Sequence, residues 1–323
     1  MTLNKKQKNY MKRTLLNLVL FINIAFLPAA AQDSVYLFSY FVGNGESGLH
    51  LAHSKDGFTW NTINKQAPFL KPGLSPDKLM RDPCIIRGKD NTFHMVWTVS
   101  WTQRGIGYAS SRDLVNWSEQ KYIPVMEHEE KARNSWAPEI TYDPREDVYM
   151  IYWATTIRGE FPETQVDADN GYNHRMYYVT TKDFETFSET KLLYDPGFNC
   201  IDATVLPYKN KWVMFLKDET RVPPQKNLKV TFADNLTGPY APASEPITGS
   251  YWAEGPTVLE VGQTWIVYFD KYTERTYGAV RSKDLKQWED ISDQVSFPQG
   301  ARHGTVFKVS QTEFRKLVKE IEY

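Results

Sequence analysis

The chain has 323 residues, enough to fill one large domain, and no Ser/Gly-rich linker or low-complexity tract divides it. Its 38 basic and 39 acidic residues leave a formal net charge of −1. Residues 1–31 hold five of the basic residues and no acidic one, so the rest of the chain carries a net charge of −6. This balance argues against nucleic acid and anionic membranes as partners, because both bind basic surfaces.

Residues 1–31 have the composition of a secretory signal peptide. The basic segment KKQKNYMKR precedes the apolar run TLLNLVLFINIAFLP, and three alanines, 29–31, form a small-residue cleavage site. The apolar run contains two asparagines and falls short of the roughly 20 residues that a membrane-spanning helix needs. We therefore expect an exported protein, periplasmic or secreted, with residues 32–323 as a single catalytic domain and no membrane partner once the signal is removed.

Two cysteines, Cys84 and Cys200, are too few for a disulfide scaffold. An oxidising compartment permits one bridge, and each cysteine lies two residues from an aspartate, so both thiols can approach one centre. The alternative is a pair of small buried thiols, which the sequence favours.

Short runs of β-branched and aromatic residues, mostly alternating and separated by turn residues, fill the rest of the chain. No amphipathic helical pattern of more than a few turns precedes TEFRKLVKEI, residues 312–321. An all-β fold is therefore predicted. The runs are VYLFSYF (35–41), GLHLAHS (48–54), FHMVWTVS (93–100), GIGYASS (105–111), VYMIYWATT (148–156), RMYYVTT (175–181), KWVMFLK (211–217), LKVTFA (228–233), TWIVYFD (264–270) and TYGAVRS (276–282).

A repeated turn sequence indicates the architecture. The form Ser/Thr-x-Asp-x-x-x-aromatic recurs about every 50–70 residues, with about four strands per unit, which is typical of a β-propeller. We expect the Asp turn between the third and the outer strand of each blade, with the aromatic residue packed between blades. The copies are SKDGFTW (54–60), SRDLVNW (111–117), TKDFETF (181–187), SKDLKQW (282–288) and the degenerate FADNLTGPY (232–240).

A second repeat places a polar residue ahead of a short strand. In a propeller the first strand of each blade lines the central channel, so the residues that open these strands meet at one mouth. The five residues expected to converge there are Asp82, Ala137, Asp202, Glu254 and His303. Their motifs are RDPCII (81–86), WAPEIT (136–141), IDATVL (201–206), WAEGPTVLEV (252–261) and RHGTVF (302–307).

The two ends of the chain complete one blade in this scheme. The N-terminal strands lack an inner strand of the repeated type, and HGTVFKV, residues 303–309, supplies one. A five-bladed β-propeller is predicted, with N- and C-terminal segments closing one shared blade so that no sheet edge is left open.

Carboxylates facing one another across a pocket suit glycoside hydrolysis. One carboxylic acid protonates the leaving oxygen, and another carboxylate activates water or attacks the anomeric carbon. A third carboxylate can keep the acid protonated near neutrality by like-charge repulsion. Asp82, Asp202 and Glu254 are the candidates. Each alone could only cap a turn or lie in a solvated bend, but three in register with the blade starts favour a catalytic role.

The motifs RDPCI, WAPEI, IDATV, EGPTV and RHGTV, in this order, resemble glycoside hydrolase family 43, whose five-bladed propellers act on arabinofuranosides, xylosides and related sugars. The resemblance implies that Asp82 is the general base, Asp202 the modulator that orients and tunes the acid, and Glu254 the general acid. It also matches His303 to an axial histidine that often holds Ca²⁺ or water in the channel. Arg81 departs from the small residue common at its position, and we expect it to turn outward or to pair with a carboxylate.

Aromatic and basic residues near the mouth are candidates for substrate binding. Trp101, Trp136, Trp252 and Arg302 are expected to contact a sugar, although packing between blades is the alternative for the tryptophans. The long polar insertion 158–175 is expected to form part of the binding site. Glu139 could reach the pocket, but strand alternation leaves its direction open.

The sequence thus predicts a glycosidase with a carbohydrate substrate, and the resemblance implies that it acts with inversion. Its sugar is expected to be arabinofuranose or a related pentose or furanose from a plant or microbial polysaccharide or oligosaccharide. No cofactor is required, although a structural Ca²⁺ could occupy the channel. Two alternatives are a catalytically inactive glycan-binding propeller and a hydrolase of a neighbouring five-bladed family, acting on fructans or agaro-oligosaccharides.

Overall fold

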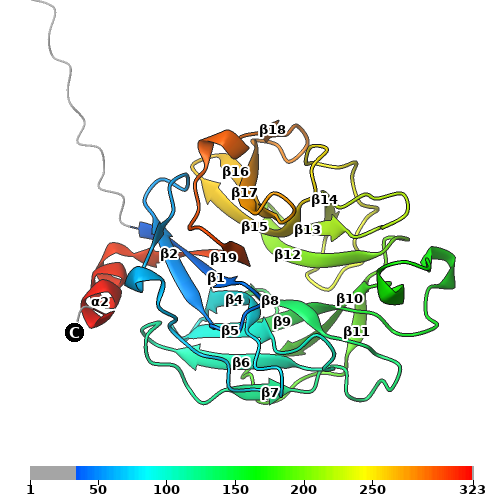
Figure 1. The fold of residues 1–323 in the computed structure, drawn as a ribbon, viewed down its shortest axis with the longest axis horizontal. Coiled ribbons are helices and arrows are strands. Elements are labelled where there is room, and N and C mark those ends of the chain that lie inside the picture. The colour runs from blue at the N-terminus through cyan, green and yellow to red at the C-terminus, as the bar shows by residue number, and fades with distance from the viewer. Residues whose placement is uncertain (1–33, 322–323) are drawn as a thin grey trace, which may run out of the picture. The chain divides into compact units, whose positions relative to one another are not determined.

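The computed structural model describes residues 34–321, and these residues form a five-bladed β-propeller, which confirms the predicted fold (Figure 1). Every blade is an antiparallel sheet whose innermost strand begins at one of the repeated motifs. The predicted signal peptide, residues 1–31, lies outside the described residues. The inner strands are β4 (Arg81–Arg87), β8 (Trp136–Asp143), β12 (Cys200–Tyr208), β15 (Glu254–Val261) and β19 (Ala301–Ser310).

The remaining strands follow outward from each inner strand. The blade of β4 continues through β5 (Phe93–Thr98), β6 (Ile106–Ser111) and β7 (Lys121–Ile123), and that of β8 through β9 (Val148–Thr155), β10 (Arg175–Thr181) and β11 (Lys191–Tyr194). The blade of β12 adds β13 (Lys211–Asp218) and β14 (Asn227–Ala233), and that of β15 adds β16 (Thr264–Lys271), β17 (Thr276–Ser282) and β18 (Glu289–Asp290). Short 3₁₀ turns are η1 (Asn64–Gln66), η2 (Pro162–Thr164), η3 (Asp169–Gly171) and η4 (Ser292–Gln294).

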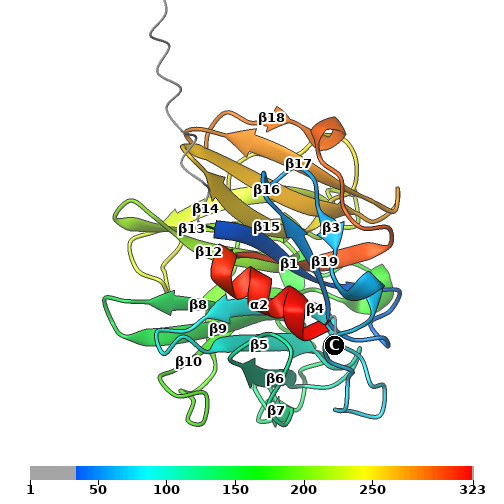
Figure 2. The same cartoon turned by 90° about the vertical axis from the view of Figure 1, so that its left-hand side faces the viewer.

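The fifth blade joins the two ends of the described chain. Its sheet runs β19, β1 (Ser34–Val42), β2 (His50–Ser54) and β3 (Asn61–Thr62), and β1 pairs with β19 from Ser34 opposite Ser310 to Val42 opposite Ala301 (Figure 2). The C-terminal segment therefore supplies the inner strand of a blade that the N-terminal segment begins, as the sequence predicted. This pairing closes the ring of blades.

Helix α2 (Gln311–Ile321) follows β19 directly and corresponds to the amphipathic pattern at the end of the sequence. The Ser310 hydroxyl accepts the Glu313 N–H at 3.2 Å, while the Glu313 carboxylate accepts the Ser310 N–H at 2.8 Å, which is a capping box. Leu317 is buried against the apolar cluster between the shared blade and the blade of β4. Within residues 34–321, no helix is long and apolar enough to cross a membrane.

Four of the repeated Asp turns lie where the sequence placed them, between the third and the outer strand, whereas the degenerate copy at 232–240 follows β14, the last strand of a three-stranded blade. In the first copy the Gly57 N–H donates to the Ser54 hydroxyl at 2.9 Å, and the Phe58 N–H donates to the Asp56 carboxylate at 2.8 Å. The same pattern recurs in the other three full copies at Ser111–Asp113, Thr181–Asp183 and Ser282–Asp284.

Aromatic residues that follow the turns pack in the apolar clusters between neighbouring blades, as expected. They are Trp60, Trp117, Phe187 and Trp288. Cys84 and Cys200 are buried in two different clusters and are free thiols, so the bridge considered above does not form. Burial raises the pKa of both thiols, which keeps them neutral.

A kink near the start of each inner strand determines how the mouth is built. Four consecutive blades have a residue with a left-handed backbone there: φ is 51° at Asp82, 47° at Ala137, 54° at Asp202 and 59° at Gly255. The pairing register with the second strand shifts at each of these points. A Cβ atom at Gly255 would lie 2.3 Å from the His303 ring, so only glycine fits at this kink.

Glu254 therefore occupies a different position from the one the sequence comparison gave it. Gly255, not Glu254, is equivalent to Asp82 and Asp202. Glu254 lies one residue before the kink of its blade. It therefore corresponds to Arg81, which lies one residue before the kink at Asp82. Residue type misplaces Glu254 because it matches one carboxylate with the others, whereas the feature that repeats from blade to blade is the backbone kink.

Candidate active site

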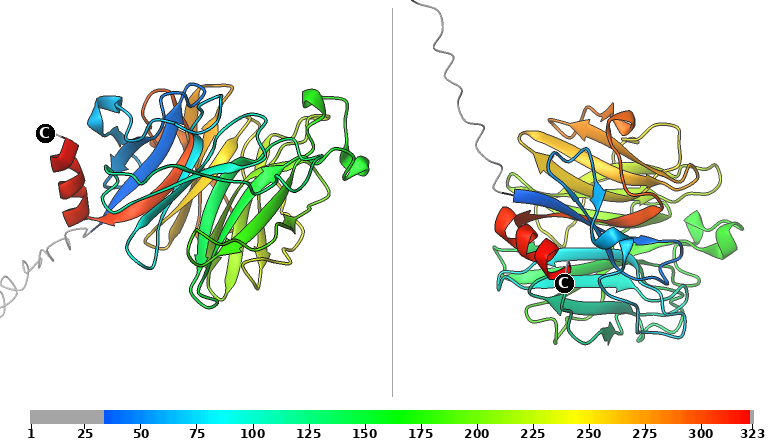
Figure 3. Two further views of the ribbon diagram at one scale, coloured as in Figure 1. Left: turned by 90° about the horizontal axis from the view of Figure 1, so that it is seen from below. Right: turned by 60° about the vertical axis from the view of Figure 1, so that its left-hand side comes forward.

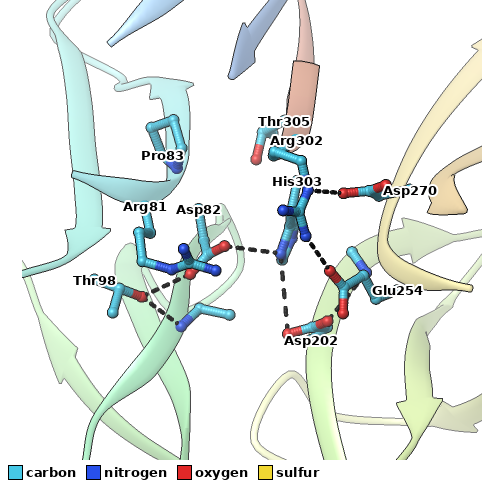
Figure 4. Close-up of polar contacts among 12 residues, drawn as sticks. Arg81, Asp82, Pro83, Thr98, Asp202, Glu254, Asp270, Arg302, His303 and Thr305 are labelled. Atoms are coloured by element: carbon cyan, nitrogen blue, oxygen red, sulfur yellow. Dashed lines mark hydrogen bonds and ion pairs between the residues drawn. The ribbon is translucent and has the colours of Figure 1, made fainter. Parts of the chain in front are cut away.

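The three predicted carboxylates meet at one mouth of the channel, around a histidine (Figure 4). Asp82 comes from β4, Asp202 from β12 and Glu254 from β15, and His303 of β19 lies between the two aspartates. Figure 3 shows how the blades are arranged in two further views, one of them from below.

His303 links the two aspartates. Its Nδ1 atom is 3.3 Å from Oδ1 of Asp82 and 3.9 Å from Oδ1 of Asp202. Burial alone would lower the pKa of His303, but the charges of Asp202 and Asp82 and the hydrogen bond to Asp82 raise it to about 9. The ring is therefore an imidazolium at neutral pH, and it supplies a positive charge between two acids.

Asp82 is held as a carboxylate. Burial alone would raise its pKa, but the hydrogen bond and charge of His303, with further help from Arg81 and the Thr98 hydroxyl, hold the pKa below its ordinary value. Thr98 donates to Oδ2 of Asp82 at 2.9 Å and accepts the Ala137 N–H at 2.8 Å. A carboxylate that stays ionised can accept a proton from water, which is what a general base requires.

Asp202 has a different environment. Its Oδ2 atom accepts the backbone N–H of Gly255 at 3.1 Å, which ties it to the residue next to Glu254. Burial is the main reason that the pKa of Asp202 rises to about 6. The charge of Glu254 adds to this rise, whereas the His303 and Lys217 cations oppose it.

Both oxygens of Glu254 are bound by cations. Lys217 lies 3.0 Å from Oε2, and Nη2 of Arg302 lies 2.9 Å from Oε1. Arg302 also donates through Nε to Asp270 at 2.5 Å. Burial and the charge of Glu254 raise the pKa of Asp270 to about 6. Arg302 was predicted to bind substrate, and the structure places it beside the candidate acid.

Three residues at the ends of second strands hold the charged groups of the mouth in place. The sequence did not single them out as partners of those groups. Each is the pairing partner of the residue before a kink: Thr98 faces Arg81, Lys217 faces Ile201 and Asp270 faces Glu254. Each contacts a group on the following blade, namely the Ala137 N–H, the Glu254 carboxylate or Arg302. Their signal in the sequence is a polar residue that ends an apolar strand, as in FHMVWT, KWVMFLK and TWIVYFD.

Glu139 points into the channel below the mouth, which settles the direction that strand alternation left open. It is buried and accepts the Tyr152 hydroxyl at 3.1 Å, while its other oxygen has no hydrogen-bond partner. Burial raises the pKa of Glu139 to about 7. The surrounding cavity, of about 210 Å³, is also lined by Thr204, Thr257 and Thr305.

Among the described residues, the side chains around His303 are not arranged as a set of Ca²⁺ ligands. Ca²⁺ takes six to eight oxygen ligands, whereas Nδ1 of His303 already faces two carboxylates. Among residues 34–321, no group of three or more His, Cys, Asp and Glu side chains is arranged to hold a metal. A bound Ca²⁺ stays a prediction, and no step of the reaction is assigned to a metal.

Two of the predicted tryptophans form a wall on one side of the mouth. The rings of Trp101 and Trp136 meet edge to face at 5.4 Å, and Trp136 donates to the Trp101 carbonyl at 3.1 Å. Tyr172, from the polar insertion, packs against Trp136 at 4.7 Å. Trp101 is 41 % exposed, so its ring is accessible to a ligand.

Two other predicted residues have different partners. Arg81 neither turns outward nor pairs with a carboxylate; its guanidinium lies 4.3 Å from the Trp101 ring centre and donates to Asn44 Oδ1 at 2.9 Å. Trp252 belongs to a separate group, where its ring centre is 5.8 Å from that of Tyr272. The structure therefore brings together the three carboxylates, Arg302 and His303, and places the tryptophans in two groups.

Comparisons with known proteins agree with the five-bladed fold. An α-L-arabinofuranosidase of Bifidobacterium longum is 22 % identical over 197 residues, which are 55 % of this chain and 18 % of that protein. A Bacteroides ovatus family 43 protein of a xyloglucan utilisation locus has a TM-score of 0.52 at 19 % identity, covering 69 % of this chain and 42 % of that one. A thermostable family 43 glycoside hydrolase has a TM-score of 0.53 at 16 % identity, covering 69 % and 78 %.

The likenesses to solved structures show the fold. The chain spans less than half of the length of the Bifidobacterium longum enzyme and of the Bacteroides ovatus protein. The family comparison covers far more of the sequence. Residues 32–315 match the family related to glycoside hydrolase family 43, whose description is "Probable glycosyl hydrolase domain". The chain therefore belongs to this family of glycosyl hydrolases.

Proposed function

We propose that the protein hydrolyses a glycosidic bond with inversion, using Asp82 as general base and Glu254 as general acid. One observation carries the proposal: Asp82, Asp202 and Glu254, from three separate blades, meet at one mouth around His303. Membership of a glycosyl hydrolase family supports it. The curated relative's name supports arabinofuranose as the sugar.

The proposed reaction assigns one task to each carboxylate. Asp82 accepts a proton from a water molecule as that water attacks the anomeric carbon, and Glu254 gives a proton to the leaving oxygen as the glycosidic bond breaks. Asp202 acts through its charge and through the Gly255 N–H that it accepts. Trp101 and Trp136 are proposed to contact the sugar or its neighbouring unit, and Arg302 to bind a sugar hydroxyl.

The substrate is tested with purified protein on a panel of aryl glycosides. The panel contains α-L-arabinofuranoside, β-D-xyloside, galactofuranoside and galactoside, and we expect the fastest release from the arabinofuranoside. Faster release from another member would reassign the sugar while keeping the chemistry. Sugar binding without turnover on every member would instead favour a glycan-binding propeller.

The stereochemical course provides a second test. Inversion needs room for a water molecule and carboxyl groups about 6.5–9.5 Å apart, and Asp82 and Glu254 lie on blades separated by the blade of His303. Proton NMR of the first-formed anomer is expected to show the opposite configuration from that of the substrate. A retained configuration would contradict the assignment of Asp82 as base.

Asp202→Asn tests the role of Asp202 as modulator. An ionised Asp202 disfavours a second negative charge nearby, so it helps the acid to keep its proton. Removal of that charge is expected to shift the alkaline limb of kcat/KM toward lower pH and to lower kcat, while the acidic limb, assigned to Asp82, moves less. The measurement is a pH–rate profile of both proteins on one substrate. An alkaline limb that stays in place or moves upward would show that Asp202 has another role.

Export is also part of the proposal. Residues 1–31 carry the pattern of a signal peptide, which supports export. Fractionation of cells that produce the full chain, with N-terminal sequencing of the product, is expected to locate a protein that starts near residue 32 outside the cytoplasm.

A further inference from the structure

A chain of alternating charges runs through the candidate acid. Successive ion pairs join Glu219 to Lys217 at 2.6 Å, Lys217 to Glu254 at 3.0 Å, and Glu254 to Arg302 at 2.9 Å. Lys226 pairs with Glu219 at one end, and Asp270 pairs with Arg302 at the other. Glu254 is thus held between two cations that come from different blades.

The two cations beside Glu254 differ in their exposure to solvent. The Lys217 side chain is only 2 % exposed, between Glu219 on one side and Glu254 on the other, and its amine lies 4.7 Å from the centre of the Tyr272 ring. Arg302 is 30 % exposed at the mouth. Arg302 can therefore contact an incoming sugar as well as Glu254, whereas Lys217 is covered by its neighbours.

A lysine fixed next to a general acid has a direct chemical consequence. An opposite charge within about 4–6 Å favours the ionised form of a carboxyl group. A general acid must carry its proton before the reaction, so Lys217 limits activity to lower pH. Asp202, whose charge favours the protonated acid, acts in the opposite direction.

We propose that Lys217 is a positioning residue that fixes the Oε2 atom of Glu254 and sets the alkaline limit of activity. The proposal rests on the proposed function, because it takes Glu254 as the general acid. Burial alone would lower the pKa of Lys217, but the charges of Glu219, Glu254 and Asp202 raise it and keep the amine protonated, and the Tyr272 ring also lies beside it.

Other charged groups near Glu254 must be held constant in a test. Arg302 contacts Glu254 directly, while Asp202 and Asp270 influence it through charge. Changing Lys217 alone leaves all three in place. Met is a suitable replacement because it has a similar length, no charge and an adaptable shape.

Lys217→Met is expected to move the alkaline limb of kcat/KM upward by about one pH unit or more. The value of kcat at the optimum is expected to fall roughly tenfold, because Glu254 loses the contact that orients it. A lysine with only a structural role would lower stability without moving the limb. Lys271→Met is the matched control, since Lys271 also ends a second strand and pairs with a glutamate, Glu274, at 2.6 Å.

A second variant covers the case in which Lys217→Met does not fold because Glu219 loses a partner. Lys217→Met/Glu219→Gln removes both buried charges together, and it is expected to give the same upward shift. Lys217→Arg keeps the charge, and its limb is expected to stay near that of the wild type.

A direct titration separates this proposal from the proposed function. In protein labelled with ¹³C at glutamate carboxyls, the Glu254 signal is assigned by its loss in Glu254→Gln and followed against pH. Its midpoint is expected to rise in Lys217→Met and to stay unchanged in Lys271→Met. A midpoint that does not rise overturns the Lys217 proposal even if the enzyme is active. A risen midpoint in a protein inactive on the whole panel upholds the electrostatic coupling and overturns the proposed function alone.

Discussion

Glu254→Gln and Asp82→Asn are each expected to lower kcat by about two to four orders of magnitude, the usual contribution of general acid or base catalysis. Glutamine cannot donate the proton that the leaving oxygen needs, and asparagine cannot accept one from water. Both replacements keep the shape of the native side chain. Asparagine also tolerates the left-handed backbone at position 82, where φ is 51°. The measurement is steady-state turnover on the best substrate of the panel.

The leaving group distinguishes the two variants. An aryl group that leaves readily needs little protonation, so a dinitrophenyl glycoside is expected to restore much of the rate of Glu254→Gln but not that of Asp82→Asn. Asp113→Asn is the matched control, because Asp113 lies in the Asp turn of the same blade and takes no part in the mouth. Near-full activity of Asp82→Asn would show that another group is the base.

Deletion of residues 303–323 is expected to abolish the cooperative fold. The deletion removes most of β19, so β1 loses its pairing partner and the mouth loses His303. The neighbouring inner strands β4 and β15 would then border an open gap, and the edge of β1 would be exposed. Size-exclusion chromatography and thermal melting are expected to show aggregation or a much lower Tm.

A shorter deletion serves as the control for closure. A chain that ends after Ser310 keeps all of β19 and loses only α2 and the residues beyond it. It is expected to melt somewhat lower, because Leu317 no longer covers the apolar cluster between the shared blade and the blade of β4, and to keep its activity. If the longer deletion were as soluble and cooperative as the shorter one, the shared blade would not be what holds the ring closed.

Much of the fold could be predicted because its signals are local and repeated. Each Asp turn is encoded by residues a few positions apart, such as Ser54 and Asp56, whose side chains bind the backbone of the same turn. The inner strands carry their own motif. The last copy, RHGTVF, is followed by no further strands of its own, which indicated that it completes the N-terminal blade. Repetition of both patterns along the chain was enough to distinguish a propeller from a sandwich.

The partners of the catalytic carboxylates were harder to predict because they depend on register between strands. Lys217 lies 37 positions before Glu254, and Asp270 lies 32 positions before Arg302. Nothing in the local sequence says that these residues meet, since the contact crosses from the second strand of one blade to the first strand of the next. The sequence also could not show that Arg81 lies against Trp101, because the loop after β5 determines this contact.

The kinks in the inner strands increase the number of side chains that one strand can place at the mouth of the channel. In a regular strand, neighbouring side chains point to opposite faces, so each strand offers one residue to a given opening. Around the kinks this alternation is broken, and adjacent residues serve the same opening: Arg81 contacts Trp101, while Asp82 contacts His303. A blade can therefore contribute one side chain that reacts and a neighbour that tunes or recognises. New specificities could arise by changing the recognising neighbour while the reacting one is kept.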